Sequence, residues 1–329
     1  MRRATRAAAL VLLAATCPSS AQAPGSVITT LTVFAGNAQG LWRTRDWGAA
    51  WELVRAPGLS DLGAAHVIQP IGPRVWLGGA GGLFVSEDFG ETWTRRGVLE
   101  DVRALVASRY PAADPTLFAG TGKGLYKSTD DGATFEPSVL RGAAVTRLDW
   151  PGPGLVVATD RGLRVSPDSA GTWHPAPRGL PEGPVHALVL SSYFSIDPVL
   201  FAAVGDEGVL RSTDGGKTWA PTALAGRRVH DLVWLGPMLY AASEGGLFRS
   251  EDAGRSFTRL GEGLGPGAVR ALLFPLAPDS GAEFFVGTDD GVFRTLDGGL
   301  RFERTGFKDG GVSVLATFPP PLPSTRPKR

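Results

Sequence analysis

Arg211–Trp219 reads RSTDGGKTW and places a hydroxyl, a carboxylate, two glycines and a tryptophan within nine residues. This combination occurs in active sites and also in tight turns. The rest of the chain distinguishes the two, because six other stretches follow the same pattern of an aspartate and, five residues later, an aromatic residue. Seven copies in one chain indicate a repeated structural unit rather than one reaction centre.

The seven copies are spaced by 38 to 46 residues along the chain. Their aspartates are Asp46, Asp88, Asp130, Asp168, Asp214, Asp252 and Asp297. The aromatic residues that follow them are Trp51, Trp93, Phe135, Trp173, Trp219, Phe257 and Phe302.

Each repeat contains four short stretches with the composition of β-strands. In the third repeat they are VRALVAS, TLFAGTG, GLYKS and TFEPS, which we call strands A, B, C and D. No segment sustains a helical period. Four strands in about 42 residues are typical of one β-propeller blade. The sequence therefore predicts an all-β fold, a single seven-bladed β-propeller with four antiparallel strands per blade.

The two ends of the repeat array complement each other. The first repeat has no well-separated A strand, whereas residues Gly311–Phe318 supply an additional one. We expect this C-terminal strand to complete the first blade, so that the propeller spans residues 24–318. The remaining residues, 319–329, read PPPLPSTRPKR, which predicts a disordered, Pro-rich basic tail.

The first 23 residues have the features of a secretory signal peptide. A basic start (Arg2, Arg3 and Arg6) precedes the apolar stretch Ala7–Ala15 and a possible cleavage site at residues 21–23. We therefore expect export to the periplasm or the medium. Lipid anchoring at Cys17, the only cysteine, is the less favoured alternative, because the AATC stretch fits a lipoprotein signal poorly.

Two further features of the sequence limit the kinds of partner that we expect. No later segment is long and apolar enough to predict a transmembrane helix. The net charge of +1 gives no indication of nucleic-acid binding. We expect a monomer without a cofactor or a metal.

The repeats resemble BNR/Asp-box repeats, whose pattern is S-x-D-x-G-x-T-W and which occur in sialidases, sortilin-type receptors, xyloglucanases and photosystem II assembly factors. The resemblance covers nearly all of the expected mature chain and implies the propeller fold, but its members include both enzymes and binding proteins. Physical reasoning assigns the aspartates a structural role. A short carboxylate can accept hydrogen bonds from the amides of its own turn, and none of the copies has the spacing of a calcium loop.

Candidate ligand-binding residues lie on the opposite face from the Asp-box turns. In an antiparallel blade the B–C loops and the starts of the A strands share one face, and in known propellers ligands usually bind there, at the mouth of the central channel. The second position of strand A holds His66, Arg103, Thr146, His186, His230, Arg270 and Ser313 in the seven blades. The B–C loops contribute Asp160, Asp206, Glu207, Glu244, Asp289 and Asp290. The alternative is that these residues only solvate strand ends and loop tips.

Two enzyme classes carry repeats of this kind, and each requires its own catalytic residues. Sialidases use an arginine triad, a tyrosine nucleophile with a glutamate, an aspartate and an Arg-Ile-Pro stretch. This chain lacks that stretch, and none of its tyrosines (Tyr110, Tyr126, Tyr193 and Tyr240) is placed like the nucleophile. The segment DPTLFAGTGKGLYKSTDDG resembles xyloglucanases, which place two carboxylates between two propellers, whereas this chain has one.

The sequence therefore favours a non-enzymatic binding scaffold that recognises a protein or a glycan at the channel mouth. The alternative is a glycoside hydrolase, xyloglucanase-like or sialidase-like, that uses carboxylates of the B–C loops.

Overall fold

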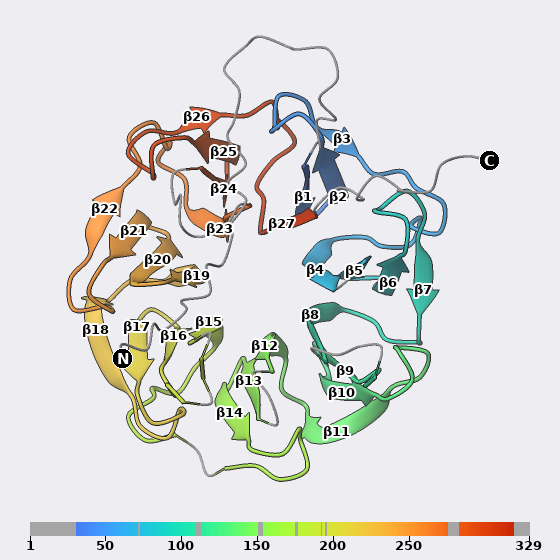
Figure 1. Ribbon diagram of the computed structural model, residues 1–329, viewed down its shortest axis with the longest axis horizontal. Helices are drawn as coiled ribbons and strands as arrows, with labels where there is room; N and C mark the ends of the chain where they lie inside the picture. The colour runs from blue at the N-terminus through green and yellow to red at the C-terminus, as the bar shows by residue number, and fades with distance from the viewer. Residues whose placement is uncertain are drawn as a thin grey trace, which may run out of the picture.

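A computed structural model describes residues 31–318, apart from residues 72, 109–112, 151–153, 175–176, 192, 195 and 276–282. Seven small antiparallel sheets are arranged around a central axis (Figure 1). This confirms the predicted seven-bladed β-propeller. The expected signal peptide (1–23) and tail (319–329) lie outside the described residues. Within the described part of the chain, no helix is long and apolar enough to cross a membrane.

The strands form four concentric layers. The innermost strands are β4 (Ala65–Ile71), β8 (Val102–Ala107), β12 (Val145–Asp149), β15 (Val185–Leu190), β19 (Val229–Leu235), β23 (Val269–Leu273) and β27 (Val314–Phe318). The second layer consists of β1 (Thr32–Asn37), β5 (Arg74–Gly79), β9 (Leu117–Thr121), β13 (Leu155–Thr159), β16 (Leu200–Val204), β20 (Met238–Ser243) and β24 (Phe284–Thr288).

The third layer carries the start of each Asp-box. It consists of β2 (Gly40–Thr44), β6 (Gly82–Ser86), β10 (Gly124–Ser128), β14 (Gly162–Ser166), β17 (Gly208–Ser212), β21 (Gly246–Ser250) and β25 (Gly291–Thr295). The outer strands are β3 (Glu52–Leu53), β7 (Thr94–Arg96), β11 (Glu136–Arg141), β18 (Ala220–Ala225), β22 (Thr258–Leu260) and β26 (Glu303–Arg304).

The fourth blade differs from the others at its outer edge. Among the described residues its sheet comprises β12, β13 and β14. The chain still follows the position of an outer strand, because the His174 amide donates to the Val165 carbonyl at 2.9 Å.

Strand β27 closes the ring by completing the first blade, as the sequence predicts. All five of its residues are paired with β1, from Val314 opposite Gly36 to Phe318 opposite Thr32. The strand begins at Val314 rather than at Gly311, although the Ser313 amide already donates to the Gly36 carbonyl at 3.1 Å. The first blade is thus built from both ends of the described chain.

The core lies within and between the blades. The second-layer strands are buried along almost their whole length. The aromatic residue of each Asp-box packs against a neighbouring blade. In the first box, the Trp51 indole contacts the Phe307 ring edge-on at 5.4 Å, and its nitrogen donates to Thr305 Oγ1 at 3.2 Å. Apolar contacts of this kind between blades hold the ring together.

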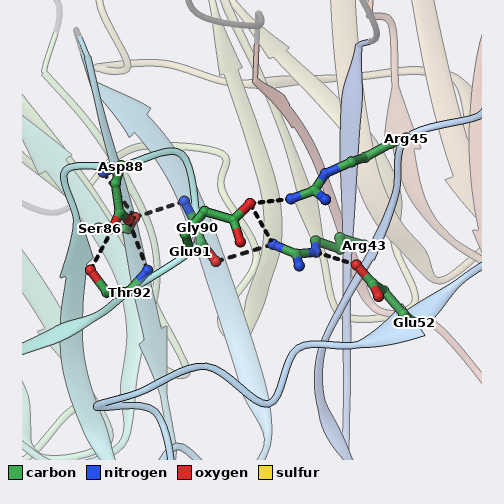
Figure 2. Close-up of polar contacts among 8 residues, drawn as sticks. All are labelled: Arg43, Arg45, Glu52, Ser86, Asp88, Gly90, Glu91 and Thr92. Carbon is green, nitrogen blue, oxygen red and sulfur yellow. Dashed lines mark hydrogen bonds and ion pairs between the residues drawn. The ribbon is translucent and has the colours of Figure 1, made fainter.

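Each Asp-box closes a turn through its own side chains. In the second box, Asp88 accepts from the Ser86 hydroxyl at 2.8 Å and from the amide and hydroxyl of Thr92 at 2.8 and 2.5 Å (Figure 2). All seven aspartates accept the hydroxyl of the residue two positions before them and the amide of the residue four positions after them. These hydrogen bonds explain why each repeat has an aspartate at this position, because its carboxylate holds the turn together.

The hydroxyl residue two positions before each aspartate is a feature that the sequence analysis did not single out. Ser86 is fully buried, and its oxygen accepts the Gly90 amide at 2.7 Å while its proton goes to Asp88. The repeated Ser or Thr at this position in all seven copies was the signal that could have revealed it.

Charged side chains also join neighbouring blades on the Asp-box side. Figure 2 shows Arg43 of β2 between Glu52 of its own blade, at 2.5 Å, and Glu91 of the next blade, at 3.2 Å. Arg43 also donates to the Gly90 carbonyl at 3.4 Å, and Arg45 pairs with Glu91. The two glutamates are exposed, so these pairs contribute little stability.

The Asp-box carboxylates predict acid sensitivity. The hydroxyls of Thr134 and Ser256 lower the pKa of Asp130 and Asp252 to about 2 from 3.8. A carboxyl whose pKa is lower in the folded state stabilises the fold above its unfolded pKa and loses this contribution as the pH falls through the folded value. We therefore expect the urea midpoint to fall between pH 5 and pH 2. A midpoint that is constant over this range would contradict the role of the carboxylates, and Asp130→Asn should flatten the profile.

The fourth Asp-box contains a strained residue. In six boxes a glycine with φ between 76° and 91° lies two residues after the aspartate, but here Ala170 takes that position with φ 75°. The glycine of this box, Gly171, follows one position later. A left-handed conformation costs a residue with a Cβ atom about 1–2 kcal/mol.

Ala170→Gly should therefore stabilise the protein by about 1 kcal/mol, after the entropy that glycine adds to the unfolded chain. Urea denaturation measures this change. Ala133→Gly provides the control, because Ala133 has no positive φ. A destabilised Ala170→Gly protein would show that the backbone is unstrained there.

Candidate ligand-binding site

A cavity of about 600 Å³ lies on the central axis and is lined by residues of all seven innermost strands. The predicted second positions of strand A all line it: His66, Arg103, Thr146, His186, His230, Arg270 and Ser313. We call these seven residues the mouth ring. The repeat register thus brings one polar side chain from each blade to a single cavity.

A β-bulge presents six of these residues. In β8 the register shifts between Val102 and Ala104, so that Arg103 is the additional residue. The same shift occurs at His66, Thr146, His186, His230 and Arg270. A bulge re-aims the side chain of the additional residue and leaves the pairing on both sides intact. The sequence analysis found the positions but not this local geometry.

One side of the mouth ring is a chain of three polar groups. Arg270 binds Asp289 through two nitrogens, at 2.8 and 3.2 Å, and its third nitrogen lies 3.0 Å from His230 Nε2. The hydrogen bond with Asp289 raises the pKa of Arg270, and the same contact lowers the pKa of Asp289. Because a guanidinium can only donate, His230 accepts through Nε2 in this arrangement.

The other side is organised by Asp101, which the sequence analysis did not identify. Arg103 binds its carboxylate at 2.9 Å, and His66 Nδ1 lies 3.5 Å from it. Asp101 precedes strand β8 and has a φ of 49°, in the left-handed region. It positions two members of the mouth ring from outside the cavity.

The histidines of the mouth ring are neutral at pH 7. Burial is the largest cause that lowers the pKa of His66, His186 and His230. For His230, burial together with the neighbouring Arg270 lowers the pKa to about 4. Neutral imidazoles can each donate one hydrogen bond and accept another.

The predicted acids border the cavity instead of lining it. Asp206 and Glu244 lie 2.9 and 3.5 Å from Arg228, and Glu244 lies 3.8 Å from His230. Asp160 accepts the Ala144 amide at 3.0 Å and lines a separate hollow between the fourth and fifth blades. Glu207 and Asp290 have no ion pair within the described part of the chain. The structure therefore separates an inner imidazole and arginine ring from an outer ring of acids.

The sequence analysis also missed two charged residues deeper in the cavity. Arg147 and Asp231 occupy the third position of their inner strands. Arg147 donates to the carbonyls of Thr146 at 2.9 Å and His230 at 3.5 Å. Asp231 accepts the amides of Leu232 and Leu272 at 3.0 and 2.9 Å. Each of them thus satisfies one backbone group of its own inner strand and one of another blade.

No metal centre is evident in the described residues, where no three His, Cys, Asp or Glu side chains are grouped to hold an ion. The tyrosines that the structure describes lie outside the cavity lining as well: Tyr126 and Tyr240 are in β10 and β20, and Tyr193 is in the loop between β15 and β16. Tyr110 lies outside the described residues.

Two family models match the sequence at its Asp-boxes. A BNR/Asp-box repeat matches residues 210–221, and a BNR-Asp box repeat matches residues 83–95. This chain thus contains BNR/Asp-box repeats within a seven-bladed β-propeller. No protein in a search of curated proteins matches it.

Solved structures similar to this BNR/Asp-box propeller agree on the fold. The computationally designed protein Ika8 has a TM-score of 0.61 at 13% identity, with 88% of each chain covered. YCF48 bound to D1 peptide has a TM-score of 0.62 at 15% identity, with 86% of this chain and 98% of that chain covered. The GH74 enzyme of Niastella koreensis has a TM-score of 0.52 at 15% identity, with 85% and 57% covered. At these identities the similarity concerns the fold alone.

Proposed function

We propose that this protein is an exported, non-enzymatic binding scaffold that recognises a protein or glycan ligand at the channel mouth. The observation that carries the proposal is the mouth ring, in which polar side chains from all seven blades converge on one cavity of about 600 Å³. This volume lies in the range of ligand pockets. The first 23 residues support export.

The charges around the mouth favour binding over glycoside hydrolysis. A glycosidase needs one carboxylic acid with a raised pKa and a second carboxylate at a suitable distance. The B–C loop acids bordering the cavity are instead held by cations, Asp206 and Glu244 by Arg228 and Asp289 by Arg270. Asp231, which lines the cavity and whose pKa is raised by burial, is bound to two backbone amides. The pKa of Asp289 is lowered, which is opposite to the requirement for a general acid.

Two solved structures illustrate both possibilities on this fold. YCF48 has been observed with a bound D1 peptide, and GH74 propellers are enzymes. The chain covers 40% of the ancestral GH74 enzyme. A single propeller of this kind suits a binding role, for which we expect a monomer.

The proposal is tested with the mature chain immobilised and exposed to an envelope extract of its host. We expect a captured ligand that is lost with the double variant His230→Ala/Arg270→Ala and retained with Asp290→Ala, which changes an exposed acid of the same face outside the cavity. Capture that is identical for all three proteins would refute binding at the mouth.

A parallel assay addresses the alternative function. We expect no hydrolysis of aryl-glycosides or β-glucans. Turnover that disappears in Asp206→Asn or Glu244→Gln would overturn the non-enzymatic assignment in favour of a glycoside hydrolase.

A further inference from the structure

Arg147 differs from the other cations of the cavity because it has no acidic partner. Its two hydrogen bonds go to backbone carbonyls, at 2.9 and 3.5 Å. No carboxylate oxygen in the described part of the chain lies within 4 Å of it. A guanidinium has five N–H donors, so Arg147 retains donors for a ligand in the cavity that it lines.

The other two arginines in the cavity are already occupied. Arg103 is bound to Asp101 at 2.9 Å, and Arg270 to Asp289 at 2.8 Å. Both therefore carry their own counter-charge. Of the three arginines, Arg147 is the one without a carboxylate at ion-pair distance among the described residues.

Asp231 is the one acid among the described residues that line the cavity, and its carboxylate binds the backbone. Each of its oxygens accepts one backbone amide, at 3.0 and 2.9 Å. Burial raises its pKa, whereas the electrostatic influence of Arg147 opposes this rise. Asp231 therefore does not use the free donors of Arg147, but its charge disfavours a ligand group with two negative charges.

His186, in the neighbouring blade, provides a second unsatisfied group. Its Nε2 atom is buried without a hydrogen-bond partner among the described residues. A buried polar atom without a partner costs free energy that a ligand can recover. His186 in β15 and Arg147 in the neighbouring strand β12 line the same cavity.

We propose that the cavity binds a carboxylate group, which pairs with the Arg147 guanidinium and accepts a hydrogen bond from His186 Nε2. A carboxylate has a single charge and matches a guanidinium in a planar arrangement. The third positions of the two neighbouring inner strands hold small residues, Ala104 in β8 and Ala187 in β15, which leave space around Arg147. This inference rests on the proposed function and names the ligand group. The carboxylate belongs to a free organic acid or to the end of a longer chain.

Isothermal titration calorimetry at pH 7 and low salt tests the proposal with two acids, N-acetylglycine and N-acetyl-triglycine, and with the C-terminal amide of the latter. We expect the acids to bind and the amide not to bind. Tighter binding of N-acetyl-triglycine would show that the ligand carboxylate belongs to the end of a longer chain. Equal binding of the two acids would show that it belongs to a free organic acid. Equal binding of the acid and the amide would overturn the proposal.

Arg147→Gln should weaken binding of the acid roughly 10- to 100-fold, the effect of a lost hydrogen-bonded charge pair. Arg161→Gln is the control, since it removes the same charge from the same blade, and Arg161 lines the separate hollow rather than the cavity. It should change the affinity by less than about 3-fold. An equal loss of affinity in both variants would show that the acid responds only to the overall positive charge, and this would refute a specific site at Arg147.

His186 allows a second test that does not depend on Arg147. His186→Gln keeps an N–H donor near the Nε2 position and should retain most of the affinity, whereas His186→Ala should lose roughly 5- to 10-fold. Equal affinities of the two variants would refute the assigned hydrogen bond. Thermal melting of each variant establishes that it is folded.

The two proposals fail in different ways. If a macromolecular ligand is captured at the mouth but none of the acids binds, the carboxylate site is wrong and the binding function remains. If the acids bind through Arg147 but no ligand is captured, the proposed scaffold function is wrong.

Discussion

A chain that ends at Val312 is expected to lose its cooperative unfolding transition. This truncation removes strand β27, whose five residues all pair with β1. It also removes Leu315, Ala316 and Phe318, which are buried in two different core clusters. Loss of a buried Leu or Phe side chain costs about 2–5 kcal/mol each. Their sum with the lost strand pairing approaches the whole stability of a typical protein, about 5–15 kcal/mol.

Near-ultraviolet circular dichroism during thermal melting measures this effect. The matched control ends at Phe318 and lacks only residues 319–329. It should melt within about 2 °C of the full chain, since it retains every paired residue of β27. Cooperative melting of the shorter chain within a few degrees of the control would show that the ring does not depend on closure by its C-terminal strand.

Trp219→Ala is expected to destabilise the protein by about 3–5 kcal/mol, the cost of a large buried aromatic side chain. Trp219 is buried among Val156 and Leu163 of the fourth blade and Leu200 and Leu210 of its own. Its indole nitrogen donates to the Gly216 carbonyl at 3.0 Å. The substitution thus removes both an apolar contact between blades and a bond that closes the turn.

The free energy of unfolding in urea measures the loss, and the melting temperature should fall by about 6–15 °C. Asp214→Ala is the comparison within the same Asp-box, with an expected cost of about 1–2 kcal/mol for the unmet hydrogen bonds of the turn. A larger loss for Asp214→Ala than for Trp219→Ala would contradict the view that packing between blades, rather than the turn, carries most of the stability.

The fold could be predicted from the sequence because the Asp-box recurs in register. Each copy fixes the end of strand C and the start of strand D, so the seven aspartates determine the blades almost alone. Closure by residues 311–318 was predictable for the same reason, since one A strand was missing at one end and present at the other. The positive φ of Ala170 was not predictable, because in this copy the glycine, Gly171, stands one position later in the sequence.

The candidate site was predictable in part. The repeat register identified the mouth ring, since equivalent positions of a propeller face the same axis. It could not identify Arg147 and Asp231, because a charged residue at a third strand position is not distinguishable from a solvent-facing one. The acids of the B–C loops were also candidates for ligand binding, but Asp206, Glu244 and Asp289 lie beside the cavity in ion pairs with Arg228 and Arg270.

Site-specific photo-crosslinking in the host tests the central claim most directly, namely that the mouth ring is the binding surface and the Asp-boxes are architecture. A photo-reactive residue is placed at Ser313, in the mouth ring, or at Leu300, which is 61% exposed in the seventh Asp-box turn. The account predicts a crosslinked product from Ser313 and none from Leu300. A product from Leu300 with none from Ser313 would contradict it.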